Sequence, residues 1–146
     1  MRTFFHILVA TAALAVVLGA SPPASAQTID VEVRAISASK QGDSFDKKLS
    51  DLKSKLEKVF ANYSHFEQLS QTSIQLDKGQ TDSVNLPEGS TLEITFHGLA
   101  KDLIKLGVDV GDKMSTTLRA SPGSTFFQAG LEYDDGILIL AITVDQ

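Results

Sequence analysis

The feature that most constrains this chain is an alternation of apolar and polar residues that begins after Asn62 and continues almost to the last residue. A period of two places successive side chains on opposite faces of a β-strand. Turn compositions rich in Gly, Asp and Pro interrupt the alternation, as at Pro87-Glu88-Gly89. The pattern predicts strands over residues 66–76, 82–86, 91–97, 103–110, 113–120, 125–133 and 137–144.

The residues before Asn62 predict one strand and one helix. Residues 29–35 alternate apolar and polar side chains, which is typical of a half-buried strand. Residues 45–60 instead repeat apolar side chains at spacings of three and four, which places them on one stripe of a helix. The stripe consists of Phe45, Leu49, Leu52, Leu56, Val59 and Phe60.

Polar residues define the start and the outer face of this predicted helix. Asp43 or Ser44 can cap its start, and Asp46 adds negative charge in the first turn. The outer face carries lysines interleaved with acids, and Asp51 and Lys55 have the spacing of an ion pair. This mixture of signs favours a solvated face over a binding surface.

The last predicted strand determines the expected architecture. Residues 137–144 read Ile-Leu-Ile-Leu-Ala-Ile-Thr-Val and offer almost no polar position. Such a strand must be covered on both faces, so it is expected to be central, beneath the helix or a second sheet layer. The sequence therefore predicts an α+β fold, with one early amphipathic helix packed on a mostly antiparallel sheet that can curl into a sandwich or half-barrel.

The N-terminal residues have the composition of an export signal. An apolar run over residues 4–20 follows a basic residue, and two prolines precede Ala24-Ser25-Ala26. This small-x-small ending predicts cleavage before Gln27, which gives a signal peptide over residues 1–26 and a single domain over residues 27–146. An uncleaved membrane anchor is the alternative, since about 17 apolar residues is the lower limit for a span. The two prolines and the Ala-x-Ala ending favour cleavage.

Composition narrows the classes of function further. The 146 residues carry a formal net charge of −5 and include no cysteine and no tryptophan. A chain without cysteine has no disulfide, thiolate zinc site, iron–sulfur cluster or thiol nucleophile. A small exported domain without disulfides fits the bacterial periplasm or secreted fraction best. The acidic balance argues against nucleic acid and against a basic membrane-surface patch, and glycines that occur singly at turns predict no cofactor-binding loop.

Four stretches carry a resemblance to known proteins, namely Val31-Glu32-Val33-Arg34-Ala35-Ile36, Phe45-Asp46-Lys47-Lys48-Leu49, Val84-Asn85-Leu86-Pro87-Glu88-Gly89 and Asp135-Gly136-Ile137-Leu138-Ile139-Leu140. The chain resembles small exported proteins of some Gram-negative bacteria that have no assigned activity. Its closing pair of strands is also similar to the strand pairs of outer-membrane secretins. Neither resemblance transfers a catalytic or binding residue.

The predicted domain contains two histidines, His65 and His97, and neither belongs to a motif with metal-ligand spacing. The sequence therefore predicts no metal site. Either histidine could act with a nearby carboxylate in a small exported hydrolase, but no G-x-S-x-G nucleophile elbow is present. Two surface or boundary histidines are the simpler interpretation.

Two acidic pairs and one polar strand are further candidates for binding. Asp109 with Asp112, and Asp134 with Asp135, could coordinate calcium, but Asp beside Gly is also what hairpin turns need. Residues 68–75 are rich in amides and hydroxyls, which could suit a sugar. Because sugars generally stack on Trp or Tyr, and Trp is absent, a solvated or edge strand is favoured.

The nearest approach to a functional site is Phe126 with Gly130. Simple alternation over residues 125–133 places Phe127 and Leu131 on the core side, and Phe126 on a polar face beside a glycine that leaves room for a partner. The alternative is that a loop or a second sheet covers Phe126.

Two functions follow from these interpretations. The first is a non-enzymatic exported domain that acts by contact with another protein or with cell-envelope material, with Phe126 and Gly130 as candidate partner-binding residues. The alternative is a small exported hydrolase that uses His97 or His65. The sequence predicts no cofactor for either function.

Overall fold

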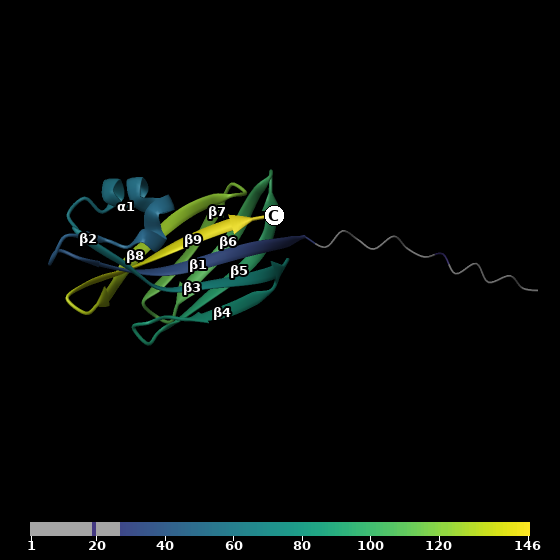
Figure 1. The fold of residues 1–146 in the computed structure, drawn as a ribbon. Helices are drawn as coiled ribbons and strands as arrows, with labels where there is room; N and C mark the ends of the chain where they lie inside the picture. The colour runs from purple at the N-terminus through teal and green to yellow at the C-terminus, as the bar shows by residue number, and fades with distance from the viewer. Residues whose placement is uncertain (1–18, 20–26) are drawn as a thin grey trace, which may run out of the picture.

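The computed structural model describes Gly19 and residues 27–146, so the predicted cleavage site and most of the export signal lie outside the described residues. Strands form two sheets (Figure 1). The five-stranded sheet has the order β2 (Ser44–Phe45), β3 (His65–Asp77), β1 (Thr28–Ser39), β9 (Gly136–Asp145) and β8 (Ser124–Tyr133). The four-stranded sheet has the order β4 (Thr81–Asn85), β5 (Thr91–Ala100), β6 (Leu103–Val110) and β7 (Met114–Ala120). Neighbouring strands are antiparallel, except that β2 runs parallel to β3.

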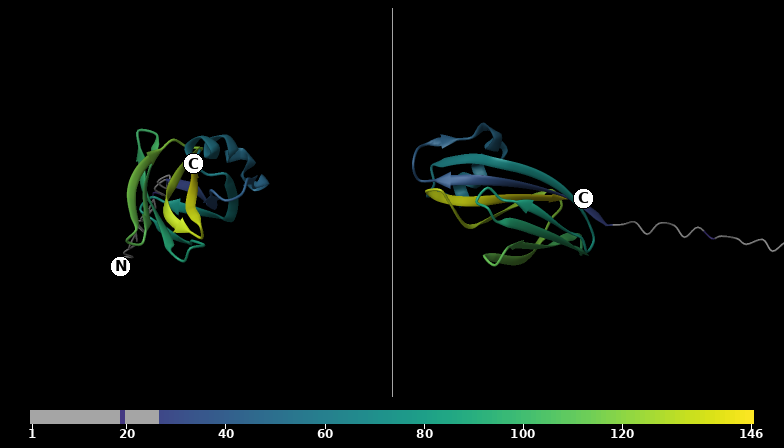
Figure 2. Two further views of the ribbon diagram at one scale, coloured as in Figure 1. Left: turned by 90° about the vertical axis from the view of Figure 1, so that its left-hand side faces the viewer. Right: turned by 90° about the horizontal axis from the view of Figure 1, so that it is seen from below.

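The two sheets lie as separate layers and enclose the larger core, here called the inter-sheet core (Figure 2). Its fully buried side chains include Phe96, Leu106 and Ile142, which point inward from β5, β6 and β9. Backbone hydrogen bonds close the layers at the turn between β3 and β4. The N–H of Lys78 donates to the Gln27 carbonyl over 3.0 Å, and the N–H of Gly79 donates to the Phe96 carbonyl over 2.7 Å. The sheets therefore form a curled half-barrel, joined along β3 and β4.

A second, smaller core lies on the outer face of the five-stranded sheet. A 3₁₀-helix, η1 (Lys47–Leu52), and the α-helix α1 (Lys53–Val59) cover this face. Leu49, Leu52 and Leu56 pack there against strand residues such as Ile139. Since Leu140 on the same strand lies in the inter-sheet core, β9 is buried on both faces. The prediction of a central, doubly covered strand over residues 137–144 is confirmed.

The predicted α+β class is corrected, because strands make up 64% of the described domain and its α-helix is short. The single amphipathic helix predicted over residues 45–60 is not confirmed. Phe45 belongs to β2, η1 follows, and only residues 53–59 are α-helical. Neither Asp43 nor Ser44 is the N-cap. Asp46 takes that place, where its side chain accepts the N–H of Lys48 over 3.0 Å.

Contacts with β3 explain why the helix cannot begin at Phe45. The rings of Phe45 and Phe66 lie 5.5 Å apart between centroids, and the N–H of Asp46 donates to the Phe66 carbonyl over 3.0 Å. The Asp46 carboxylate also accepts the N–H of Gln68 over 3.1 Å. These bonds hold Phe45 and Asp46 in an extended conformation against β3, so helical turns start only after Asp46.

The spacing of the leucines fits the two kinds of helix. Leu49 and Leu52 are three residues apart and both buried, as on a 3₁₀-helix with three residues per turn. Leu56 follows after four residues on α1 and is also buried. Val59 is 59% exposed, because α1 ends there and Phe60 packs toward the core instead. Among the described residues, no helix has both the length and the apolar character needed to cross a membrane.

Candidate functional site

His65 lies in a hollow of about 300 Å³ together with Ser44, Asp46 and Glu67. The geometry does not assemble a catalytic group. His65 Nε2 is 4.0 Å from the nearest Glu67 oxygen, and both Asp46 oxygens already accept backbone N–H groups. Ser44 and His65 are register partners in the β2–β3 pairing, but no side-chain hydrogen bond joins them in the part of the chain that the structure describes. The hollow therefore lacks a nucleophile hydrogen-bonded to its base.

His97 occupies an irregular position in β5. The register with β6 shifts between Phe96 and Gly98, so His97 is the extra residue of a bulge, and its side chain is exposed. Its ring lies over Gly107 on the neighbouring strand, where a side chain would meet Nε2 at 2.8 Å. The described residues show no ion pair of His97 with a carboxylate. Within residues 27–146, His65 thus has one carboxylate at the limit of ion-pair distance and His97 has none.

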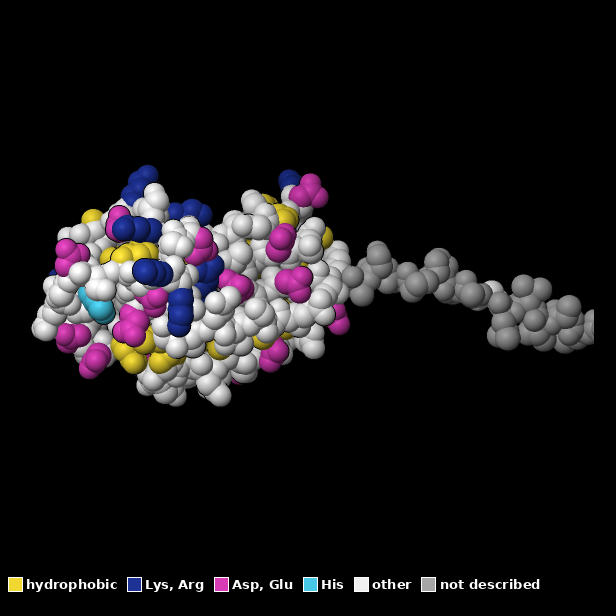
Figure 3. Space-filling view, viewed as in Figure 1, with side chains coloured by type: hydrophobic (Ala, Val, Ile, Leu, Met, Phe, Trp, Pro, Cys, Tyr) yellow, Lys and Arg dark blue, Asp and Glu magenta, His cyan; other side chains and the backbone are white. Residues whose placement is uncertain are grey.

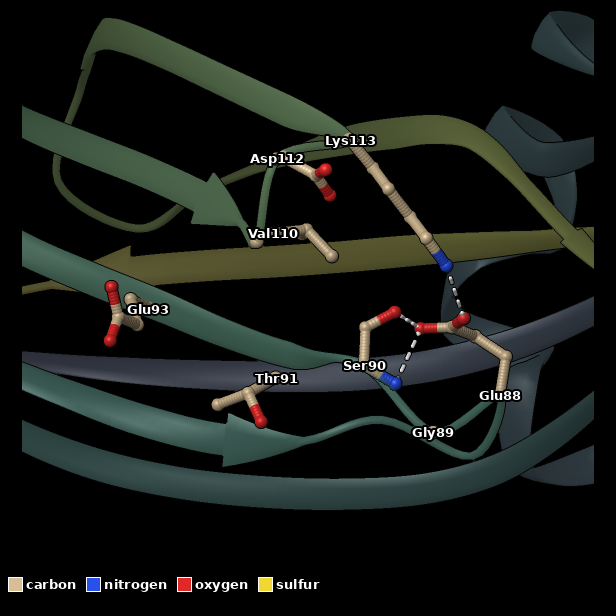
Figure 4. A pocket seen from close by; sticks show the side chains of 9 residues that line it. Glu88, Gly89, Ser90, Thr91, Glu93, Val110, Asp112 and Lys113 are labelled. Atoms are coloured by element: carbon tan, nitrogen blue, oxygen red, sulfur yellow. Dashed lines mark hydrogen bonds and ion pairs between the residues drawn. The ribbon is translucent and has the colours of Figure 1, made fainter.

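A hollow of about 560 Å³ lies between the β4–β5 and β6–β7 turns (Figure 4). Glu88 accepts hydrogen bonds from the backbone N–H and the hydroxyl of Ser90, and Lys113 Nζ reaches across to it at 3.2 Å. Asp112 also lines this hollow, but Asp109 accepts the Ser115 hydroxyl instead. The Glu88 carboxylate therefore links the β4–β5 turn to the β6–β7 turn through Ser90 and Lys113.

The acidic pairs do not form a metal centre. Among the described residues, no group of three or more His, Asp or Glu side chains could hold a metal ion. Asp134 adopts a φ of 53° in the turn between β8 and β9, the left-handed conformation that Asp tolerates in hairpin turns.

The polar run over residues 68–75 lies on β3. At the outer edge of β3, the short strand β2 pairs only with His65 and Phe66. The interpretation of this run as an edge strand is confirmed.

The structure places Phe126 differently from simple alternation. The β8–β9 register shifts between Ala129 and Leu131, so Gly130 is an extra residue with a φ of 129°. Phe126 and Leu131 both pack on the inter-sheet core, whereas Phe127 packs on the smaller core, with its ring 5.9 Å from that of Phe60. The assignment of Phe127 and Leu131 to one face is therefore wrong, and so is the polar face assigned to Phe126. The role of Phe126 and Gly130 in binding a partner stays a prediction.

Phe126 belongs to the side of the half-barrel where β7 and β8 each end a sheet without pairing with one another. We call these two edge strands the open margin. Four apolar side chains of the open margin pack on the inter-sheet core and stay only partly buried: Met114, Leu118, Phe126 and Tyr133. Sequence reasoning missed Met114 and Leu118, although their alternation in residues 113–120 was the available signal. It could not show that β7 and β8 end their sheets on the same side.

Comparison with known proteins adds no further constraint on the open margin. No protein-family model, no curated protein and no solved structure matches this chain. The functional interpretation therefore depends on the geometry of the chain itself.

Proposed function

We propose that this protein is an exported, non-enzymatic β-domain that acts by contact, and that its open margin binds an extended segment of a partner protein. The proposal agrees with the resemblance to small exported bacterial proteins and with the composition of residues 1–26. Exported protein is expected to begin at Gln27, because signal peptidases cleave after a small-x-small site. Mass spectrometry of the intact exported chain tests this, and a chain that keeps Met1 in the membrane fraction would contradict it.

The observation that carries the proposal is the partial burial of Met114, Leu118, Phe126 and Tyr133 along two unpaired edges. An edge strand presents free backbone N–H and C=O groups, to which an extended peptide can add as a further strand. Such a strand beside β7 would extend the four-stranded sheet and place alternate side chains over the inter-sheet core. The added strand would form hydrogen bonds with the free backbone groups of β7, and its side chains would cover the partly buried apolar residues of the open margin.

Within the open margin, β7 is the better template for an added strand. Its register with β6 is continuous from Met114 to Ala120, and it contains no proline and no bulge. By contrast, β8 is interrupted by the bulge at Gly130, and bulges hinder the addition of strands at sheet edges. The partner strand is therefore proposed to pair with β7, and Phe126 to provide an apolar anchor from β8.

Site-specific crosslinking tests the location of the partner. A photoreactive amino acid at Thr117, exposed on β7, is expected to capture a partner in the cell envelope, whereas the same group at Ser83 on the edge strand β4 is expected to capture none. In the purified complex, hydrogen exchange of the β7 amides should slow, because an added strand accepts their N–H groups. Equal capture at both positions, or unchanged exchange in β7, would refute the proposal.

Substitutions at two neighbouring phenylalanines distinguish an effect on partner binding from an effect on stability. Phe126→Ser and Phe127→Ser each truncate a partly buried ring, so each is expected to lower the free energy of unfolding by about 1–3 kcal/mol. Only Phe126→Ser should weaken capture of the partner, by about tenfold or more, because Phe127 packs against the helical side of the sheet. If the two variants lose capture equally, Phe126 has no role beyond stability.

A further inference from the structure

Basic residues are distributed unevenly over this acidic domain. Six of its twelve basic residues are lysines between positions 40 and 58, a stretch that contains four acids; the rest of residues 27–146 holds six basic and fourteen acidic residues. All six lysines are exposed, and Figure 3 shows dark blue side chains gathered over the helical region. We call this surface the lysine face; it consists of Lys40, Lys47, Lys48, Lys53, Lys55 and Lys58.

The acids interleaved with these lysines are largely engaged with other groups. The two oxygens of Asp51 accept hydrogen bonds from Arg34 on β1 over 2.6 and 2.9 Å, and this contact with the guanidinium lowers the pKa of Asp51. The predicted pair of Asp51 with Lys55 is therefore not formed. Asp46 accepts two backbone N–H groups, and Glu57 lies 3.8 Å from Lys53.

As a result, most of the lysine face has no partner of opposite charge in the structure. Among the described residues, no carboxylate lies within ion-pair distance of Lys47, Lys48, Lys55 or Lys58. The helical region is therefore more basic than the rest of the domain despite the acidic total. A field of this kind orients a protein with its basic side toward an anionic surface and turns the acidic side away.

An exposed apolar residue lies within the lysine face. Val59 follows Lys58 at the end of α1 and is 59% exposed. Within residues 27–146, the only other exposed large hydrophobic side chain is that of Leu99. Lysines around an apolar side chain are the combination by which amphipathic segments lie at a lipid interface. Anionic headgroups would attract the lysines, and the boundary below the headgroups would accept Val59. A soluble polyanion offers only the first of these interactions.

We propose that the lysine face binds an anionic lipid surface, with α1 lying against the headgroups and Val59 directed into the interface. This inference is independent of the open margin, which is formed by β7 and β8 rather than by the helices.

Vesicle binding tests the proposal. The probe is phosphatidylcholine vesicles in which about a third of the lipid is phosphatidylglycerol, with pure phosphatidylcholine vesicles for comparison. Sedimentation with the vesicles is expected only for the anionic composition. It should fall steeply between about 50 mM and about 500 mM salt, because salt screens exposed charges.

A matched pair of triple variants locates the surface. Replacing Lys47, Lys55 and Lys58 by Gln should weaken the partition onto anionic vesicles by at least about tenfold. The control replaces Lys78, Lys101 and Lys105 by Gln, which changes the net charge equally outside the lysine face, and it should retain the partition within about twofold. The chain purified from the exported fraction is used throughout, because the apolar run over residues 4–20 of an uncleaved chain would itself partition into both kinds of vesicle.

Three outcomes would overturn the proposal. Equal losses in the two triple variants would mean that only total charge matters. Equal binding to neutral and anionic vesicles would exclude the lysines as the recognising groups. Binding to heparin as tight as binding to anionic vesicles, unaffected by Val59→Ser in both cases, would point to a soluble polyanion instead of a lipid surface.

Discussion

Replacement of Leu56 by Asp is expected to lower the free energy of unfolding by about 4 kcal/mol. Leu56 is fully buried between α1 and the outer face of the five-stranded sheet, where it packs in the smaller core. A carboxylate at this place would lose its hydration without gaining a partner, and the leucine contacts would also be lost. Leu52, which is 4% exposed, is expected to behave in the same way. Urea unfolding followed by circular dichroism measures the loss.

Val59→Asp is the matched control, because simple periodicity places Val59 on the same stripe as Leu56. Since Val59 is 59% exposed, the same substitution should cost no more than about 1 kcal/mol, part of it from negative charge at the end of a helix. A loss at Val59 as large as that at Leu56 would mean that the helical segment packs with a different face inward.

The different exposure of Leu56 and Val59 shows what periodicity can and cannot predict. Spacings of three and four correctly identify which side of residues 49–56 is apolar. They cannot show where helical turns start or end, because that depends on Phe45 and Asp46 bonding to β3, a strand that follows the helix in the chain. A local signal therefore identified the buried leucines, while a non-local contact shortened the helix.

The strands were the most predictable part of the fold. The strand predicted over residues 103–110 coincides with β6, and the prediction over 137–144 falls one residue short of β9 at each end. Alternation and turn composition are properties of neighbouring residues, so they can be read directly. The division into two sheets and the order within each sheet depend on pairings between distant segments, which no local pattern encodes.

Bulges account for the incorrect faces. Each bulge adds one residue to a strand and reverses the alternation beyond it. At Gly130 the added residue places Phe126 and Leu131 on one core, although they are separated by an odd number of positions. The glycine was visible in the sequence, but its φ of 129° was not. Phe126 was thus proposed for an incorrect reason, and its present proposal depends instead on the open edges of β7 and β8.

The ion-pair partners of the charged residues also could not be predicted from the sequence. Asp51 lies one helical turn from Lys55, which predicted a local ion pair, yet its carboxylate bonds to Arg34 on β1. Arg34 is placed beneath η1 by the β1–β9 and β1–β3 pairings, and its side chain is only 13% exposed. A partly desolvated guanidinium that offers two parallel donors competes well against a flexible lysine. Lys55 is left without its predicted partner because of this non-local contact.

Gly136→Ala is expected to be among the most damaging single substitutions that add only one carbon. Gly136 begins β9 beside β1, and a Cβ built there would overlap the carbonyl oxygen of Ala38 and lie 3.0 Å from its carbonyl carbon and 3.2 Å from Cα of Ser39. These are backbone atoms of a paired strand, so they cannot move aside as a flexible side chain would. The start of β9 would have to separate from β1, at a cost of about 3 kcal/mol or more.

Gly111→Ala provides the comparison, because it adds the same carbon where no atom lies within 4 Å of the new Cβ. Gly111 has a φ of 51°, so alanine there should cost only about 1–2 kcal/mol for the left-handed conformation. In thermal unfolding, Gly136→Ala is expected to lower the melting temperature at least about twice as far as Gly111→Ala. Equal decreases would show that the steric overlap at Gly136 costs no more than the left-handed φ at Gly111. They would also mean that the start of β9 moves away from Ala38 without cost, which would contradict the close pairing of β9 with β1 there.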